Sequence, residues 1–396
     1  MSGETEPVLV VPTDAHNTRL VSNVHPPHWQ NPTPALSPHD SAERFTKLGV
    51  DVFLGEARFT GPETIRVAGQ TLRFKRAVIA TGARAVQSAV PGLAEAGCLT
   101  NGTVFSLTRC PARLAVIGGG PIGCELAQTF QRLGSQVSVL HKNAHLLDRE
   151  DLDAAALVQK AFLREGVCVR LNAQITHVER AGDAKIICYE AQGKQEAIPV
   201  DEILVGAGRA PNVEGLNLEA VSVQYDPLQG VLVNDRLQTT NPRIYAVGDV
   251  CLAWKFTHAA DFSARIVIQN ALFLGRKKAS ALTMPCCTYT DPEIAHVGLY
   301  ERDARDRGLA VDTYVREFME VDRAVLVRIP FGRRTGQLTD VTGERTEESD
   351  TDLKDGRFRS SLDQTLGLLG AYYYNRTRLT PTVKKWMRRW LEWQRR

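Results

Sequence analysis

The feature that most restricts the fold of this chain is a glycine turn, Gly118-x-Gly120-x-x-Gly123. The apolar run RLAVI ends directly before it, and the helical pattern CELAQTFQRLG directly follows it. A turn with this spacing between a strand and a helix is the fingerprint of a dinucleotide-binding βαβ unit. The first glycine permits a tight turn, the second lets the backbone approach a pyrophosphate, and the third allows the helix to pack closely on the strand.

We therefore predict a dinucleotide site at this turn, because backbone N–H groups and the positive end of the helix dipole face the phosphates there. The predicted pyrophosphate-binding residues are Gly118, Gly119, Gly120, Pro121, Ile122 and Gly123. The alternative interpretation is a glycine-rich turn that binds no ligand. The strand before the motif and the helix after it are the context that favours the dinucleotide site.

The residues after the second strand of this unit bear on which nicotinamide cofactor binds. About twenty residues beyond the glycine turn, an NAD site usually carries an acidic residue that bonds the ribose 2′-hydroxyl. This chain has His141 and Lys142 there, after the strand SQVSVL. Basic residues suit a 2′-phosphate, so the sequence favours NADP(H) over NAD(H). Alternatively, the two residues are only the solvated end of a strand.

Strand and helix patterns alternate along most of the chain. Its 396 residues suffice for roughly two or three domains with cores of their own. Between 112 and 236, the glycine turn and its helix are followed by a strand, an amphipathic helix over 151–166 and further strands at 167–171, 174–179 and 184–190. This order predicts an α/β, doubly wound Rossmann-like domain with an inserted β-meander.

Three further strands end on glycine-containing turns: AVIATGARA (77–85), DEILVGAGRAPN (201–212) and RIYAVGDV (243–250). In this order around the glycine fingerprint, they resemble the FAD-dependent pyridine nucleotide–disulfide oxidoreductases. The similarity is closest to the mercuric reductase-like branch, through the segments FTHAADFSARIVIQNALF, CTYTDPEIAHVG and YNRTRLTPTVKKW. It covers about 41–326, resumes at about 371–396, and on one interpretation includes HNTRLVSNVHPPHWQNP near the N-terminus.

The resemblance implies an α/β fold with doubly wound FAD- and NAD(P)-binding domains and a truncated α+β dimerisation region. It divides the chain into an extended N-terminal arm (1–40), a remnant of the FAD-binding domain (41–111), the NAD(P)-binding domain (112–236), the second part of the FAD-binding domain (237–283) and an altered dimerisation region (284–396). The family forms homodimers through that last region, so its altered sequence puts a dimer in question.

The resemblance also implies roles for single residues. Glu125 would lie beside the nicotinamide, and Gly208 would pack near the same cofactor. Thr81 and Gly82 would contact FAD, and Asp249 would bond the ribityl chain of the flavin. Taken without the resemblance, Glu125 is an ordinary acid in a first helical turn, where the dipole favours negative charge, and Asp249 is an ordinary turn residue.

The chain departs from the family pattern in three respects. Relatives begin with an FAD-binding strand, GxGxxG turn and helix, soon followed by a C-x4-C redox pair. Here no GxGxxG precedes residue 118, and none of the eight cysteines has that spacing. The acid–base histidine of the family's HPxxxE segment is also missing, because the last histidine is His296. We therefore expect FAD to bind weakly or not at all, assign no catalytic residue, and interpret the pattern as an internal deletion with a shifted or substituted segment.

Two functions follow. In the first, the chain is an FAD-dependent NAD(P)H oxidoreductase, similar to the mercuric reductases but without the disulfide centre. NADPH would reduce FAD, which would pass electrons to a small-molecule acceptor such as a disulfide, a metal ion or a quinone, while the protein supplies orientation and electrostatics. In the second, the chain is a catalytically inactive NADP(H)-binding module derived from that family. The family pattern favours the first function, and the missing motifs favour the second.

Charge, hydropathy and cysteine spacing argue against several other classes. The net charge is +3, but residues 376–396 carry eight Arg or Lys and one acidic residue, so the basic charge is confined to one tail and nucleic-acid binding is not expected. No apolar run approaches the roughly 18 residues of a membrane span, and the acidic N-terminus does not resemble a secretory signal. The cysteines show no disulfide-scaffold or zinc-ribbon spacing, so we predict a cytoplasmic protein without a metal site.

Two C-terminal segments and one cysteine pair carry further expectations. Residues 332–361 contain only four apolar residues in thirty, so we expect them to be disordered or loosely attached. Residues 382–396 form a basic, Trp-rich helical pattern, which fits docking on the body of the protein better than contact with a membrane surface or an acidic partner. We interpret the adjacent Cys286 and Cys287 as structural and not as a redox pair.

Overall fold

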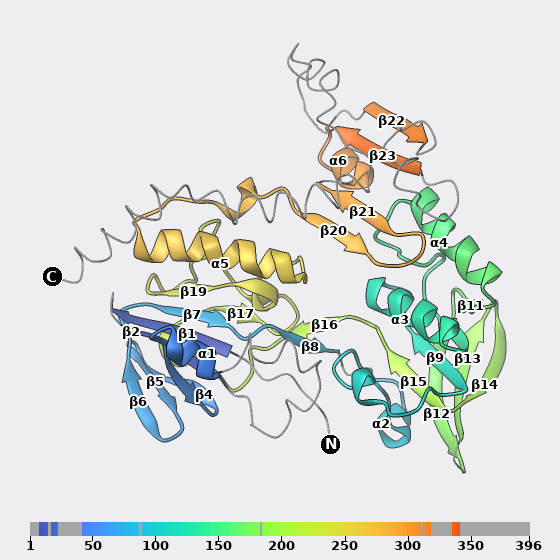
Figure 1. Ribbon diagram of the computed structural model, residues 1–396, viewed down its shortest axis with the longest axis horizontal. Coiled ribbons are helices and arrows are strands. Elements are labelled where there is room, and N and C mark those ends of the chain that lie inside the picture. The colour runs from blue at the N-terminus through green and yellow to red at the C-terminus, as the bar shows by residue number, and fades with distance from the viewer. Residues whose placement is uncertain are drawn as a thin grey trace.

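The computed structural model describes residues 8–14, 17–22, 42–86, 89–182, 184–298, 300–309, 312–317 and 335–340. We call residues 89–206 the central domain. The strands and helices before and after it in the sequence build a split domain, and the residues from 284 onward form the C-terminal region (Figure 1). Among the described residues, no helix is long and apolar enough to cross a membrane. The Trp-rich pattern at 382–396 lies outside these ranges.

The central domain is built on a parallel sheet with the strand order β11-β10-β9-β15. The strands are β9 (Arg113–Ile117), β10 (Gln136–Leu140), β11 (Cys168–Arg170) and β15 (Glu202–Val205). Helices α3 (Pro121–Arg132) and α4 (Leu152–Arg164) pack on one face, where Val116, Ala127 and Phe162 share one buried cluster. The strand, turn and helix predicted around the glycine motif are therefore confirmed.

An antiparallel meander covers the other face of this sheet. It consists of β12 (Gln174–Ala181), β13 (Ala184–Ala191) and β14 (Lys194–Val200). Ile187 and Tyr189 are fully buried in one cluster with Ile203 of β15 and with residues of the short helix α2 (Leu93–Ala96). The meander predicted between two strands of the sheet is confirmed, and the parallel sheet is enclosed on both faces, as such sheets require.

The split domain combines strands from both sides of the central domain in the sequence. Its five-stranded sheet has the order β19-β7-β1-β2-β3. The strands are β1 (Val8–Asp14), β2 (Asn17–Ser22), β3 (Asp51–Leu54), β7 (Ala77–Ala80) and β19 (Ile244–Ala246). Helix α5 (Thr257–Leu272) packs on one face through Ile266 and Val267. The antiparallel strands β4 (Ala57–Gly61), β5 (Thr64–Val67) and β6 (Gln70–Arg73) cover the other face through Phe59 and Ile65.

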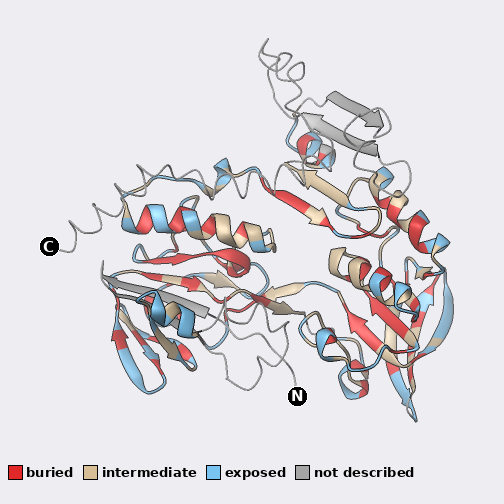
Figure 2. Cartoon of the chain, in the orientation of Figure 1, coloured by how far each residue is buried: buried red, intermediate tan, exposed pale blue. Residues whose placement is uncertain are grey.

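Two short strands, β8 (Ala83–Ala85) and β16 (Arg209–Pro211), carry the chain between the two domains and pair with each other (Figure 1). The remaining short elements are α1 (Ala42–Lys47), β17 (Tyr225–Asp226) and β18 (Gly230–Val231), with the 3-10 helices η3 (Val104–Ser106), η4 (Leu218–Val221), η5 (Gly248–Val250) and η6 (Ala279–Ala281). Burial is concentrated in the strands and on the sheet-facing sides of the long helices (Figure 2).

The sequence predicts an extended arm over residues 1–40, and the structure incorporates two parts of it into a sheet. β1 and β2 form an antiparallel hairpin. β1 also pairs antiparallel with β7, with Val8 opposite Ala80, and β2 pairs parallel with β3. Unpaired N–H and C=O groups along a strand edge favour the addition of a partner strand, so these extended residues complete the sheet instead of standing apart from it.

The C-terminal region begins with a hairpin of β20 (Pro285–Thr288) and β21 (Ile294–Val297), followed by helix α6 (Glu301–Asp306). Beyond it, β22 (Asp312–Glu317) pairs antiparallel with β23 (Thr335–Asp340). Six residues of the segment 332–361, for which the sequence predicts disorder or loose attachment, form β23, because pairing with a distant strand supplies hydrogen bonds that composition does not reveal. The rest of 332–361 lies outside the described residues.

Candidate dinucleotide-binding site

The glycine turn joins β9 to α3 through two close backbone contacts. A Cβ atom added to Gly123 would lie 2.0 Å from the carbonyl oxygen of Gly118, and one added to Gly118 would lie 2.7 Å from the carbonyl oxygen of Gly206. Gly118 also has φ 108°, in a region that residues with side chains rarely adopt. Only glycine fits at these two positions, and their contacts bring the start of α3 directly onto the end of β9.

The middle glycine of the turn is open. Gly120 precedes α3 with extended backbone (φ −78°, ψ −178°), and a Cβ atom added to it would meet no atom within 4 Å. Pro121 begins the helix, and no side chain caps its amino end. The first N–H groups of a helix lack intrahelical partners, so this end of α3, with the half-buried Ile122 in its first turn, offers donors and partial positive charge to an anion.

His141 is locked into the glycine turn. It is 6% exposed, and its Nδ1 accepts a hydrogen bond from the N–H of Gly119 at 3.0 Å. Its Nε2 lies 4.0 Å from Asp148 Oδ2 and has no hydrogen-bond partner among the described residues. Burial lowers the pKa of His141 against the opposing effect of Asp148, so the ring is neutral at neutral pH. The predicted basic pair is therefore corrected: His141 shapes the turn, and only the exposed Lys142 offers positive charge to a ligand.

Glu125 and Gly208 lie close to the same turn. Glu125 is in the second turn of α3, and its Oε1 accepts a hydrogen bond from the backbone N–H of Tyr289 at 2.9 Å. Burial raises the pKa of Glu125, and this hydrogen bond opposes the rise. Gly208 follows two residues after Gly206, whose backbone packs against Gly123, and it has φ 121°. Glu125 therefore lies on the same helix as the glycine turn, and Gly208 follows directly on the strand end that packs against that turn.

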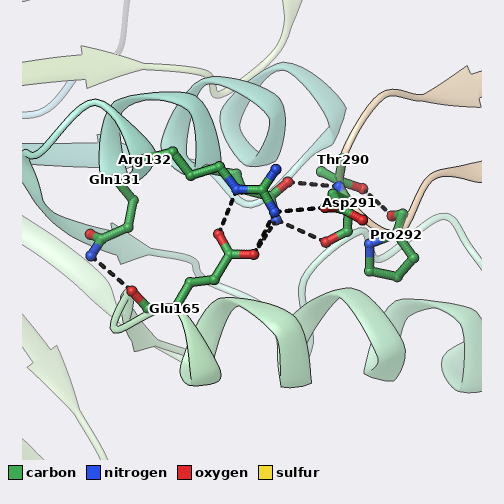
Figure 3. A network of polar contacts seen from close by, with 7 residues as sticks. Gln131, Arg132, Glu165, Thr290, Asp291 and Pro292 are labelled. Carbon is green, nitrogen blue, oxygen red and sulfur yellow. Dashed lines mark hydrogen bonds and ion pairs between the residues drawn. The ribbon is translucent and has the colours of Figure 1, made fainter. Parts of the chain in front are cut away.

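A polar network fixes the loop between β20 and β21 to α3 and α4 (Figure 3). Gln128 donates through Nε2 to the carbonyl of Asp291 at 2.8 Å and accepts the Asp291 N–H at Oε1 at 2.7 Å. Arg132 pairs with Asp291 Oδ2 at 2.8 Å and with Glu165 Oε1 at 2.6 Å. Because Glu125, Gln128 and Arg132 lie on one helix, α3 holds both the glycine turn and the C-terminal hairpin.

The residues predicted for FAD lie at the carboxyl ends of β7 and β19 in the split domain. Thr81 Oγ1 donates to the carbonyl of Asn212 at 2.6 Å, and Asn212 Nδ2 donates to the carbonyl of Thr81 at 2.9 Å. Gly82 follows with φ 67°. Asp249, in η5, forms an ion pair with Arg209, Nη1 to Oδ2, at 2.8 Å. Ligands of open α/β sheets bind at this edge, so these positions suit a cofactor.

The described residues fit one part of FAD and not another. The carboxylate of Asp249 retains acceptor capacity beyond its ion pair, and the buried Nε of Arg209 has no hydrogen-bond partner in the described part of the chain. The pyrophosphate of a dinucleotide needs a helix amino end after the first strand of the sheet. Here β1 runs antiparallel to β7 and is followed by β2. Among the described residues, those on the flavin side suit the cofactor, and no helix directly follows β1 to offer an amino end to the pyrophosphate.

The cysteines form no disulfide, and those near α3 are not activated. Cys286 and Cys287 lie on β20, and burial raises their pKa values to about 11 and about 12. Cys124 is fully buried behind the glycine turn, and burial raises its pKa as well. The thiolate is the nucleophilic form, so all three are protonated at neutral pH. This supports a structural role for the adjacent pair.

Comparisons with known proteins agree with this geometry. The family model described as pyridine nucleotide-disulphide oxidoreductase matches residues 8–264, and the model of the family's dimerisation domain matches residues 284–332. The chain belongs to the pyridine nucleotide-disulphide oxidoreductase family. It combines FAD/NAD(P)-binding domains with a dimerisation domain in a mixed α/β fold, which confirms the predicted family and fold class.

Individual relatives point to the predicted branch. A mercuric reductase of Lysinibacillus sphaericus is 37% identical over 278 residues, which are 70% of this chain and 51% of the relative. A dihydrolipoyl dehydrogenase of Thermus scotoductus is 36% identical over 285 residues, 70% of this chain and 60% of the relative. This chain therefore spans about half the length of the mercuric reductase. The HOCl-induced flavoprotein disulfide reductase RclA from Escherichia coli, solved as a Cu(II) complex, superposes with a TM-score of 0.67 at 25% identity over 79% of this chain and 76% of its own.

Sequence reasoning missed the residues that tie the parts of the site together. Gln128 and Arg132 are polar residues four apart on a helix, a pattern typical of a solvated face. Their partner Asp291 comes from more than 150 residues away in the chain. Arg209 and Asn212 lie in the segment DEILVGAGRAPN, which was singled out only for its glycines. No local signal links these residues to their partners.

Gly120→Ala should separate cofactor binding from folding. Its methyl group would meet no protein atom, and its backbone suits alanine, so the thermal unfolding midpoint should be unchanged or slightly higher. The methyl group would occupy space that a pyrophosphate needs, so NADPH affinity should fall about tenfold or more by titration calorimetry. Gly123→Ala is the contrasting variant, because it should also lower the unfolding midpoint. Unchanged NADPH affinity in Gly120→Ala would exclude this turn as the site.

His141 should make the protein less stable in mild acid. Its pKa in the folded chain is below the ordinary value of 6.5, so the unfolded chain binds more protons. The stability that the neutral His141 ring contributes is complete above pH 6.5. It is lost as the pH falls from 6.5 towards the lower pKa that His141 has in the folded chain. His141→Asn keeps an acceptor for the Gly119 N–H, so its unfolding midpoint should fall less between about pH 7.5 and 5.5. His296, whose pKa burial also lowers, should account for part of the remaining fall. Identical pH profiles for the two proteins would contradict this assignment.

Proposed function

We propose that this chain binds a pyridine dinucleotide, NADP(H) in preference to NAD(H), at the amino end of α3. The observation that carries the proposal is the open Gly120 between two positions where only glycine fits. A phosphate placed there would approach the backbone at a helix terminus that no side chain caps. When bound, the nicotinamide supplies hydride chemistry, and the chain supplies anchoring and orientation.

Different residues of this site would bind different parts of the cofactor. The N–H groups at the start of α3 would hold the pyrophosphate, whereas the N–H of Gly119 is committed to His141 and serves to shape the turn. Lys142, exposed at the end of β10, would pair with a 2′-phosphate. Glu125 and Gly208 would border the nicotinamide end. The tie between Glu125 and the backbone of Tyr289 would keep that carboxylate in one position.

An FAD-dependent NAD(P)H oxidoreductase with a small-molecule electron acceptor is the second candidate. Family membership supports it, as do Thr81, Gly82 and Asp249 at one edge of a sheet. The names of the relatives include mercuric reductase and dihydrolipoyl dehydrogenase. This chain has no C-x4-C pair and no histidine after His296, so its own residues support reduction of mercuric ion or a disulfide less well than they support dinucleotide binding.

Assembly and location are further parts of the proposal. The dimerisation-domain match over residues 284–332 supports self-association of two copies through the C-terminal region. The sequence over about 327–369 departs from the family pattern that we recognise on either side of it, so we expect a weaker dimer than an unaltered region would form. The cytoplasmic location stays a prediction from cysteine spacing.

Lys142→Glu should weaken NADPH and favour NADH. A hydrogen bond to a charged group contributes about 1.5–3 kcal/mol, so its loss should cost NADPH roughly tenfold or more in affinity. Titration of both cofactors into the parent protein should give tighter binding of NADPH. Lys75→Glu makes the same charge change at an exposed position of the split domain and should leave the preference unaltered. Equal affinities in the parent protein would refute the role of Lys142.

The purified protein should contain much less than one flavin per chain, measured by visible absorption. A stoichiometric flavin would contradict this statement.

With FAD and NADPH added, the protein should not reduce a disulfide or mercuric ion at rates typical of its relatives, because exchange needs a thiolate pair beside the flavin. The assay is NADPH oxidation, comparing a disulfide with a quinone. Brisk disulfide turnover that is lost in a Cys286→Ser, Cys287→Ser double variant would contradict this prediction.

A further inference from the structure

A β-bulge places two polar side chains side by side on the outer face of the meander. The register between β12 and β13 shifts between Ile175 and His177, which makes Thr176 the extra residue on its strand. Ile175 and Val178 both pack against the core of the central domain. Thr176 and His177, which lie between them, therefore both belong to the face away from the core.

Three different metal-ligating side chains meet on this face. Cys188 lies opposite His177 in the strand register, and Glu179 lies two residues after His177 on the same face of the strand. Their ligand atoms all lie within 4.8 Å of one another, and His177 Nε2 is 3.0 Å from Glu179 Oε1. Ligands about 2.0 Å from one ion at a tetrahedral angle are roughly 3.3 Å apart, so this spacing suits a shared ion.

Thr176 determines which nitrogen of His177 faces the other two side chains. Its hydroxyl donates to the carbonyl of Cys188 at 3.1 Å, and the same oxygen lies 3.1 Å from His177 Nδ1. When the Thr176 hydroxyl donates to the carbonyl of Cys188, its oxygen can accept the N–H of His177 Nδ1. In that tautomer the lone pair of Nε2 faces the Glu179 carboxylate, which is the arrangement in which both side chains can coordinate one metal ion.

We propose that His177 Nε2, the Glu179 carboxylate and the Cys188 thiolate form a site for Zn²⁺ or a similar borderline divalent ion. Nitrogen, oxygen and sulfur are the donors that zinc takes in proteins, and three protein ligands leave a fourth position for water. Imidazole and thiolate do not suit Mg²⁺ or Ca²⁺, which prefer oxygen. The sequence did not predict this site because His177 and Glu179 meet Cys188 only through strand pairing. It does not depend on dinucleotide binding.

Binding of the ion should release a proton from Cys188. Burial raises the pKa of this thiol, and the charge of Glu179 raises it further, so the metal-free thiol is protonated at neutral pH. A metal ligand must be the thiolate. Zinc affinity should therefore increase with pH, and about one proton should leave per ion bound. An ion held by His177 and Glu179 without Cys188 would release no thiol proton.

Cobalt and zinc binding by the whole chain, treated with a chelator and kept reduced, tests the proposal. Co²⁺ should produce a near-ultraviolet thiolate-to-cobalt absorption band that saturates at one ion per chain and disappears on adding Zn²⁺. Cys188→Ser should abolish the band. His177→Ala, and Thr176→Val through the lost partner of Nδ1, should weaken zinc binding about 10–100-fold. Cys110→Ser removes an exposed thiol from the same domain and is the matched control that should keep the band.

Circular dichroism and the unfolding midpoint of each metal-free variant establish that it is folded before its metal binding is compared. The proposal is overturned if the parent protein shows no thiolate-to-cobalt band, or if Cys188→Ser keeps the band of the parent. It is also overturned if folded Thr176→Val binds zinc as tightly as the parent protein, because Nδ1 would then not need its acceptor. Loss of the band in Cys188→Ser and its retention in Cys110→Ser support the site.

Discussion

The backbone contact between Gly123 and the carbonyl of Gly118 is the constraint on which the central domain depends. Any side chain at position 123 would overlap that carbonyl, so the helix can start this close to the strand only with glycine there, and Gly118 is required separately by the carbonyl of Gly206. This contact directs the amino end of α3 to the carboxyl edge of the parallel sheet, where its partial positive charge is available to an anion. His141 reinforces the same geometry from the neighbouring strand, because its neutral ring accepts the N–H of Gly119 and is too buried to act as a cation.

Helix α3 connects the glycine turn to the C-terminal region through side-chain contacts. Its first turn is the proposed pyrophosphate site, while Glu125, Gln128 and Arg132 hold the loop between β20 and β21 from the second turn onward. Gln128 and Asp291 exchange two hydrogen bonds in the manner of a strand pair, and Arg132 joins Asp291 to Glu165 on α4. A rigid helix with contacts at both ends cannot shift at one end without moving the other. One helix therefore holds both the glycine turn and the hairpin in place.

The parts of the site that could be predicted are those determined by neighbours in sequence. The glycine spacing and the apolar runs beside it depend on contacts within a dozen residues, and the strand, turn and helix followed from them. The role of His141 could not be predicted in this way, because the orientation of its ring depends on one N–H in a turn 22 residues earlier. Thr81 and Asn212 are 131 residues apart, and their paired hydrogen bonds arise only when the chain returns to the split domain. Composition likewise suggested disorder for residues that pair as β23.

The two sheets differ in the direction of the strand after which a phosphate-binding helix would begin. In the central domain, β9 runs parallel to β10 and β15, so its carboxyl end and the helix that follows lie at the ligand-binding edge. In the split domain, β7 and β19 also run parallel, and they bring Thr81 and Asp249 to the corresponding edge. β1 beside them runs the other way, with Val8 opposite Ala80, so its carboxyl end lies at the far edge of the sheet. A helix that followed β1 would begin on the side opposite Thr81. The order of strands alone therefore does not restore a phosphate site, because the dipole of a helix aids an anion only at the edge where the strand before it ends.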